Sequence, residues 1–152
     1  MNDIDEIDRR LVVALQRDAG QSLEVLGETV GLSRNACWRR IRALEQANII
    51  TGRIVTVDAA RLGFGLQVFM QVRTNAHAPD WLEKFSNATR AMPEIQGVYR
   101  MSGDLDYLIR ARVADMAGYD ALYQRLIRKV PLSDVSASFV MEEIKETAQL
   151  PL

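Results

Sequence analysis

The segment Gly31-Leu32-Ser33-Arg34-Asn35-Ala36-Cys37-Trp38-Arg39-Arg40-Ile41-Arg42-Ala43-Leu44 combines a tight turn with a helix whose two faces differ. Ser33 can accept hydrogen bonds from the free backbone N–H groups at the helix start. At about 100° per residue, Cys37, Ile41 and Leu44 fall on one apolar stripe. Nearly opposite fall the polar side chains of Asn35, Arg39, Arg42 and Gln46. This pattern is typical of a helix that packs by one face and enters the major groove of DNA by the other.

The polar face predicts two kinds of DNA contact. Asn35 and Arg39 are candidates for base edges, because an amide suits adenine and a guanidinium suits guanine. Ser33 and Arg34 lie at the helix start and are better placed for phosphate. For Arg40 two alternatives stay open, a structural hydrogen bond or a phosphate contact. The predicted DNA-binding residues are Ser33, Arg34, Asn35, Trp38, Arg39, Arg40 and Arg42.

An ordinary helix with a solvated basic face is the alternative explanation of these arginines. The turn, the cap and the short helix that precede the segment favour DNA binding. Trp38 either packs at the edge of the domain or touches the DNA backbone. Cys37 lies on the inner stripe, where we expect a small buried hydrophobe.

The composition is that of an ordinary globular chain. With 152 residues, 48% hydrophobic and 26% charged, it suits one domain or two small ones and is unlike a disordered chain. The formal net charge is −1, yet residues 31–53 hold five arginines and a single acid, Glu45. One basic helix in a near-neutral chain fits sequence-directed DNA binding better than charge-driven coating.

A single cysteine and a single histidine limit the available chemistry. They can form neither an intramolecular disulfide nor a zinc site of the usual Cys/His kind, so we expect no metal and no cofactor. His77 is expected to be a plain loop residue. The N-terminal sequence is unlike a signal peptide, and no apolar run approaches the ~20 residues of a membrane span. We therefore expect a cytoplasmic protein without a membrane partner.

The apolar pattern has a helical period up to about residue 52. The sequence predicts a first helix that Gly20 closes, a second over 22–31, and a third from Ser33 to about Ala47. Asn48 follows in a position where a left-handed residue would end the helix. These elements form a helix-turn-helix domain over 1–52, and the alternating residues after Gly52 predict a connecting strand or wing within 53–62.

The second half, 63–152, alternates between strand and helix patterns. It predicts strands at 66–73, 95–101, 107–113 and 136–145, and helices at 80–92 and after residue 115. The order β-α-β-β-α-β indicates a ferredoxin-like antiparallel sheet with both helices on one face. The whole chain is thus α+β, with a winged helix-turn-helix before a ferredoxin-like domain. Side chains such as Phe69 and Val140 would leave the other sheet face apolar and uncovered, which predicts a homodimer through this domain.

The chain resembles the leucine-responsive/asparagine-regulator (Lrp/AsnC, feast/famine) family of transcription regulators over essentially its whole length. Two positions depart from the family pattern. Asn48 stands where many relatives have Gly, and Gly20 stands where Arg is frequent, so one common charge after the first helix is absent. The motifs that carry the resemblance are Asp5-x-x-Asp8, Gly31-Leu32-Ser33, Arg40-Ile41-x-x-Leu44-Glu45, Ile49-Ile50-x-Gly52, Gly103-Asp104-x-Asp106-Tyr107 and Glu142-Glu143-Ile144-Lys145.

The resemblance implies a ligand-sensing second domain, in which a small molecule, commonly an amino acid, binds between dimers that assemble into octamers or similar discs. Gly103-Asp104-Leu105-Asp106 has an ordinary explanation as a β-turn. The resemblance implies that this loop also lines the effector pocket, with backbone groups on a carboxylate, Asp104 or Asp106 on an ammonium group, and hydroxyls of the last strand nearby. The predicted effector-binding residues are Met101, Ser102, Gly103, Asp104, Asp106, Ser136 and Ser138.

These observations predict a transcription regulator that binds double-stranded DNA and responds to a small-molecule effector. Two alternatives stay open. In one, the second domain only builds the oligomer and the protein organises DNA without an effector. In the other, the ferredoxin-like domain is an enzyme, but the sequence holds no histidine beside a nucleophile, no Gly-rich phosphate loop and no metal-ligand cluster. We therefore expect no enzymatic activity.

Overall fold

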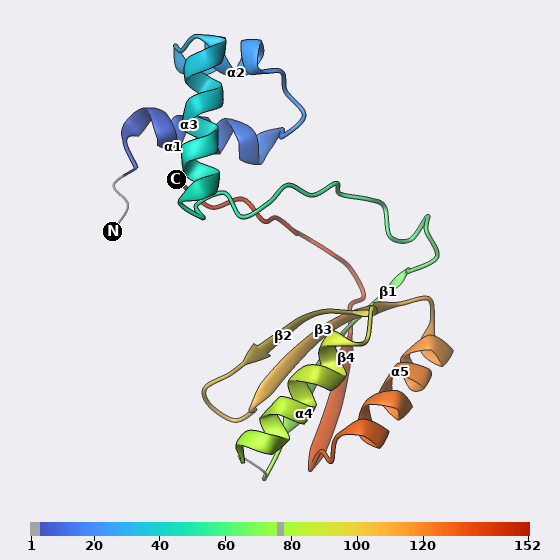
Figure 1. Cartoon of the computed structure of the whole chain (residues 1–152). Coiled ribbons are helices and arrows are strands. Elements are labelled where there is room, and N and C mark those ends of the chain that lie inside the picture. The colour runs from blue at the N-terminus through green and yellow to red at the C-terminus, as the bar shows by residue number, and fades with distance from the viewer. Residues whose placement is uncertain (1–3, 76–77) are drawn as a thin grey trace. The chain divides into compact units, whose positions relative to one another are not determined.

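The computed structural model describes residues 4–75 and 78–152, and Figure 1 shows its helices and strands. The chain divides into two compact units. The helical unit is Met1–Thr56 with Lys145–Leu152, and the effector unit is Val57–Ile144. The prediction for His77 lies outside the described residues.

The helical unit contains the three helices that the sequence predicts. They are α1 (Glu6–Arg17), α2 (Leu23–Val30) and α3 (Arg34–Gln46). Each begins after a capping side chain that accepts a hydrogen bond from the backbone N–H three residues on: Asp5 at 2.8 Å, Ser22 at 3.3 Å and Ser33 at 3.3 Å. Asn48 has a φ of 55°, which confirms the left-handed residue predicted after α3.

The three helices share one core. Cys37 is fully buried, as predicted for a small hydrophobe on the inner stripe. Burial removes apolar surface from water, and this fixes the rotation of α3 about its own axis. The buried members of the core are Leu11, Ala14, Leu26, Val30, Cys37, Ile41 and Leu44.

The turn between α2 and α3 brings two backbones into close contact. Gly31 ends α2 in the left-handed region with a φ of 76°. The N–H of Leu32 then donates to the carbonyl of Gly27 at 2.8 Å. A Cβ on Gly27 would lie 2.5 Å from the Leu32 carbonyl oxygen, so this position has no room for a side chain.

The effector unit is a four-stranded antiparallel sheet in the order β2-β3-β1-β4. Helices α4 and α5 both lie on one face of it (Figure 1). This confirms the predicted ferredoxin-like β-α-β-β-α-β arrangement. Its elements are β1 (Leu66–Arg73), α4 (Pro79–Arg90), β2 (Ile95–Arg100), β3 (Tyr107–Val113), α5 (Met116–Lys129) and β4 (Asp134–Phe139).

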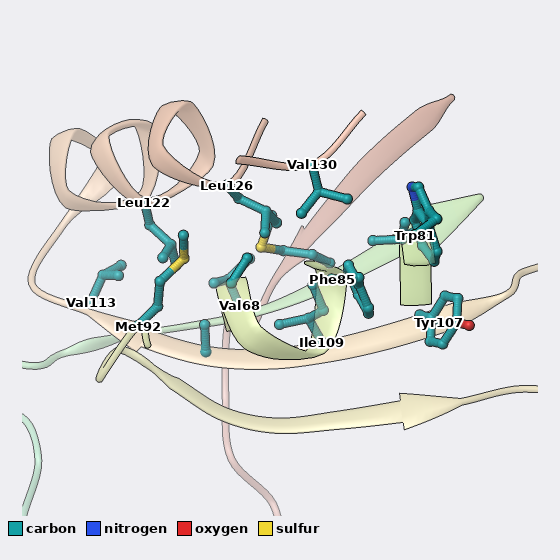
Figure 2. Close-up of a cluster of buried hydrophobic side chains, with 14 residues drawn as sticks. Val68, Trp81, Phe85, Met92, Tyr107, Ile109, Val113, Leu122, Leu126 and Val130 are labelled. Atoms are coloured by element: carbon teal, nitrogen blue, oxygen red, sulfur yellow. The ribbon is translucent and has the colours of Figure 1, made fainter. Parts of the chain in front are cut away.

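The core of the effector unit lies between the sheet and the two helices (Figure 2). An aromatic cluster occupies the part beneath α4: the rings of Trp81 and Phe85 stack with centroids 5.1 Å apart, and Phe85 lies 4.8 Å from Tyr107. The indole Nε1 of Trp81 donates to the Pro131 carbonyl at 2.8 Å, so its buried N–H is satisfied.

The opposite sheet face is more polar than the sequence led us to expect. Phe69 is half-buried there, but its register partners on the neighbouring strands are Arg110 and Ser138. Val140 follows the end of β4, and its N–H donates to the Gln67 carbonyl of β1 at 3.0 Å. The prediction of an apolar face was therefore wrong. Successive side chains of a strand point to opposite faces of the sheet, and those that point to this face are mostly polar.

The strand predicted after Gly52 is absent from the described residues. The side chains of Ile54, Val55 and Val57 are 80%, 86% and 64% exposed, and none of residues 51–58 belongs to a strand. An alternating pattern indicates a strand only where a neighbouring strand supplies backbone hydrogen bonds, and the single chain supplies none here.

The C-terminal segment also differs from the prediction. The last strand was predicted over 136–145, but β4 ends at Phe139, and residues 145–152 pack with the helical unit. The side chain of Gln16 explains this placement. Its Oε1 accepts from the Leu150 N–H at 2.7 Å and its Nε2 donates to the Leu150 carbonyl at 3.4 Å.

Replacing Gly27 by Ala tests the close approach at the turn. Alanine gains about 1 kcal/mol of helix propensity, but it forces a backbone carbonyl to move, and overpacking of this kind costs about 1–3 kcal/mol or more. We expect a net loss of roughly 1–2 kcal/mol in the free energy of unfolding of the helical unit, measured by urea titration. Gly52→Ala, which would meet no atom within 4 Å, serves as the control and should change it little.

Candidate DNA interface and effector loop

The outer face of α3 presents two polar side chains that are free to bind a ligand. Asn35 and Arg39 are exposed and lie four residues apart, which places them one above the other on the helix. Within residues 4–75 and 78–152, neither side chain takes part in a hydrogen bond or an ion pair. Binding through them therefore breaks no interaction inside this part of the protein.

Two further arginines of α3 make weak pairs with acids of the same unit. Arg34 lies 3.0 Å from the carboxylate of Glu24 in α2, and Arg42 lies 3.2 Å from that of Glu45. All four side chains are accessible to water, and exposed pairs of this kind contribute about 0–1 kcal/mol. Both arginines can exchange these partners for phosphate at little cost.

Trp38 extends from α3 beside Arg42. Its side chain is 54% exposed, and the Arg42 Cζ lies 5.8 Å from the centre of its ring. The ring and the guanidinium line a cavity of about 300 Å³ together with apolar side chains of α1 and α2. Trp38 thus lies at the edge of the domain, with enough free surface to contact a neighbouring molecule.

Glu45 and Arg53 complete this part of the surface, although the sequence argument assigned them no role. The two carboxylate oxygens of Glu45 bind Arg42 at 3.2 Å and Arg53 at 3.3 Å. The carboxylate of Glu45 therefore pairs with one arginine within α3 and with another that follows the helix. In the sequence, Glu45 is the single acid within the basic segment and the last residue of the motif Arg40-Ile41-x-x-Leu44-Glu45.

Arg40 takes the structural alternative of the two that the sequence left open. Its NH1 lies 2.7 Å from Asp5 Oδ2 and 2.8 Å from Asp8 Oδ1, which ties α3 to the start of α1. The Asp8 and Asp5 hydrogen bonds raise the pKa of Arg40. The pKa of Asp5 is lowered, first by the N–H of Asp8 and then by the Arg40 guanidinium.

The loop between β2 and β3 is a closed turn with exposed tip residues. The N–H of Met101 donates to the Asp106 carbonyl at 2.8 Å, and this bond closes the loop. Gly103 has a φ of 111°, a conformation that residues with a side chain rarely adopt. Met101, Ser102, Gly103 and Asp104 are all exposed, so their polar groups are open to a ligand.

The carboxylates of the two loop aspartates differ in burial and in hydrogen bonding. Asp106 is half-buried, and its Oδ2 accepts from the Thr74 N–H at 2.8 Å, so part of this carboxylate is already used by the fold. The Asp104 carboxylate is exposed and accepts no hydrogen bond from the described residues. Asp104 is therefore the better candidate for an ammonium group.

Arg73, at the end of β1, holds the loop in place and was missed by the sequence argument. Its Nε donates to the Asp104 carbonyl at 2.9 Å, and its NH1 pairs with Asp134 Oδ2 at 2.7 Å. One side chain thus joins the loop to the start of β4. Nothing in the sequence marks this contact, because its members are separated by 31 and 61 residues.

Ser136 and Ser138 lie on the polar face of the sheet, and no hydrogen bond joins them to the loop in the part of the chain that is described. Ser136 Oγ donates to Gln71 Oε1 at 3.5 Å instead. The register places Ser136 opposite Gln71 and Ser138 opposite Phe69 of β1.

The described residues contain no group of three or more His, Cys, Asp or Glu side chains arranged to hold a metal ion. None of their helices is long and apolar enough to cross a membrane.

A helix-turn-helix unit with a basic outer face, joined to a βαββαβ unit, defines the class of two-domain DNA-binding regulators. Residues 4–45 match the AsnC-type helix-turn-helix domain, and residues 67–150 match the Lrp/AsnC ligand binding domain. The chain belongs to the Lrp/AsnC family of transcription regulators. It is a DNA-binding regulator with a ligand-binding domain and not an enzyme.

Relatives match this chain along nearly its whole length. The DNA-binding transcriptional activator DecR of Escherichia coli K12 is 43% identical over 150 residues, which cover 98% of this chain and 99% of DecR. The crystal structure of an AsnC family transcriptional regulator from Agrobacterium tumefaciens superposes with a TM-score of 0.93 at 42% identity and covers 97% of both chains. A transcriptional regulator of Neisseria meningitidis in complex with L-Met also gives 0.93, at 31% identity, covering 98% of this chain and 97% of that one.

Replacing Arg40 by Gln tests its structural role, and the resulting change in Tm should depend on pH. Since the folded pKa of Asp5 is depressed, its contribution to stability is fully present above its ordinary pKa of about 3.8 and is lost as the pH falls through the folded value. We expect Arg40→Gln to lower the Tm of the helical unit by about 2–5 °C at pH 7, and by clearly less at pH 2.5. Thermal unfolding followed by circular dichroism measures both differences.

Arg39→Gln is the matched control, because Arg39 belongs to the same helix and has no partner among the described residues. It should leave the Tm unchanged at both pH values. A Tm for Arg40→Gln equal to that of the parent protein at pH 7 would contradict the structural assignment.

Proposed function

We propose that the chain regulates transcription by placing α3 in the major groove of operator DNA. Asn35 and Arg39 contact base edges, and Ser33, Arg34 and Arg42 contact phosphates. Trp38 lies against the DNA backbone next to Arg42, and Arg40 stays with its two acids and orients the helix. The observation that carries the proposal is the exposed pair Asn35 and Arg39, which has no partner among the described residues.

The protein acts as a homodimer or a higher assembly in this proposal. Two copies meet through the polar sheet face, where Phe69, Leu108 and Tyr99 supply the apolar contacts. Two recognition helices in such a dimer reach half-sites about one helical turn apart, or a multiple of it. Dimers joined further, into an octamer for example, would extend the same spacing along DNA.

The effector is an amino acid that binds at the loop 101–106. Asp104 supplies a carboxylate for the α-ammonium group, and the exposed backbone N–H groups around Gly103 suit the α-carboxylate. The Neisseria meningitidis relative, whose structure holds L-Met, supports this ligand class. Ser136 and Ser138 lie on β4, which β1 separates from β3 and the loop, and they contribute to the site where a second copy meets the first.

Effector and DNA are coupled through the assembly. A ligand that prefers one arrangement of subunits shifts the population toward it and changes the separation of the recognition helices. A regulator without an effector would bind DNA equally well with any amino acid present. A thermal-shift screen with the twenty amino acids separates the two cases, because a ligand that binds only the folded state raises the Tm.

The double variant Arg39→Ala, Arg42→Ala tests the DNA interface. Each lost base or phosphate contact weakens binding by about 1–3 kcal/mol, so the loss of two should raise the Kd for the DNA upstream of the protein's own coding region about 30-fold or more. The salt dependence should also become shallower, by about one unit of slope for each phosphate contact removed. A mobility-shift titration at several salt concentrations measures both.

Arg17→Ala removes an exposed arginine from α1 of the same unit and should have little effect on the Kd. If the double variant binds as tightly as the parent protein, α3 is not the recognition helix.

The Asp104→Asn variant tests the effector loop. Loss of a charge-assisted hydrogen bond costs about 1.5–3 kcal/mol, so the Kd of the amino acid that gives the largest thermal shift should rise about 10- to 100-fold. Isothermal titration calorimetry measures the change. Asp120→Asn, an exposed acid of α5, is the control. Equal affinity in Asp104→Asn and the parent protein would place the effector elsewhere.

A further inference from the structure

A groove of about 440 Å³ runs between α4 and the edge strand β2 of the effector unit. Its walls include Phe85, Ile95, Val98 and Tyr107, and Val98 keeps 37% of its surface exposed. The volume lies within the range of small-molecule sites, which are mainly apolar with a few polar groups at defined points. The function proposed above uses neither this groove nor the residues of its walls.

The groove carries two arginines and, among its described lining residues, no acid. Arg90 and Arg100 are both exposed, and neither guanidinium makes a hydrogen bond or an ion pair with any described part of the chain. This differs from the cavity beside Trp38, where both arginines already pair with the carboxylate of Glu45. An uncompensated pair of cations attracts an anion.

The two arginines lie at opposite ends of the groove. α4 and β2 run in opposite directions (Figure 1), so Arg90 at the end of α4 lies beside the start of β2, whereas Arg100 ends β2. From Gln96 to Arg100 the strand extends about 13 Å, at about 3.3 Å per residue. Apolar side chains lie between the two charges.

The edge of β2 is poorly suited to pairing with another strand. Its register with β3 shifts between Ile95 and Gly97, which interrupts the regular ladder. Irregular edges with charged side chains are the features that prevent strand addition. This favours a small molecule over a peptide or a second copy as the occupant.

We propose that this groove is a second ligand site for an elongated dicarboxylate, with one carboxylate on Arg90, the other on Arg100, and an aliphatic middle over the exposed side chains of Leu82 and Val98. Arginine side chains are long enough to reach toward one another along the groove, so a chain of about eight carbons can bridge the two charges. Arg100 and Tyr107 flank the loop 101–106 in sequence, so a ligand here also restrains both ends of that loop.

Octanedioate tests the proposal by calorimetry on the full-length protein. We expect saturable binding, with a Kd that rises about tenfold in Arg90→Gln and about tenfold in Arg100→Gln, and no measurable binding in the double variant. Octanoate should bind about tenfold more weakly and 1,8-octanediol not at all. Arg128→Gln, an exposed arginine of α5, is the matched control and should bind octanedioate like the parent protein.

A second readout places the ligand. Trp81 stacks on Phe85, so octanedioate should change its fluorescence in a Trp38→Phe background, where it is the remaining tryptophan. The proposal is overturned if octanedioate does not bind, or if the arginine variants bind it like the parent protein. It is also overturned if Asp104→Asn, but not Arg90→Gln, abolishes binding, because the ligand then occupies the effector loop.

A second copy of the chain is the remaining alternative occupant of the groove. If the arginine variants change the sedimentation coefficient and octanedioate binds to none of the proteins, the groove is an interface between copies and the dicarboxylate site does not exist. If Asp104→Asn no longer binds the amino acid but still binds octanedioate, the groove and the effector loop are separate sites, and the dicarboxylate proposal is supported.

Discussion

The burial of Cys37, Ile41 and Leu44 is the constraint on which the DNA interface depends. A helix that buries one stripe cannot rotate without exposing it, so the opposite stripe is held toward the outside. Polar interactions then refine this placement: Arg40 anchors α3 to the start of α1, and the close approach at Gly27 limits how α2 and α3 can meet. Recognition by Asn35 and Arg39 is thus a consequence of packing on the far side of the same helix.

The effector unit uses a comparable arrangement at the loop between β2 and β3. Backbone hydrogen bonds close the loop, Asp106 binds Thr74, and Arg73 joins the loop to β4. These contacts leave Asp104 at an exposed tip with little freedom in the backbone behind it. A ligand that binds such a tip does not have to order it first, which preserves affinity.

The arginines of this chain show why charge alone does not identify a binding surface. Arg34, Arg40, Arg42 and Arg53 all have carboxylate partners, whereas Arg39, Arg90 and Arg100 have none among the described residues. An exposed pair such as Arg34 with Glu24 is weak and exchanges readily for phosphate, whereas Arg40, with two carboxylates, is committed to the fold. An arginine without a partner gives up only its hydration to bind an anion, so the partners of each arginine are more informative than the number of arginines.

Caps, turns and apolar periods determined the three helices, the order of strands and the basic face of α3 from sequence alone, because these signals act between residues a few positions apart. The same local signals misplaced the strand after Gly52 and the end of β4, where pairing depends on a neighbour that the pattern cannot supply. The Arg40 ion pairs, the Arg73 contact and the groove between Arg90 and Arg100 join residues that the fold alone brings together. Only the tertiary structure decided which charged side chains already pair with other groups of the protein and which have no partner among the described residues.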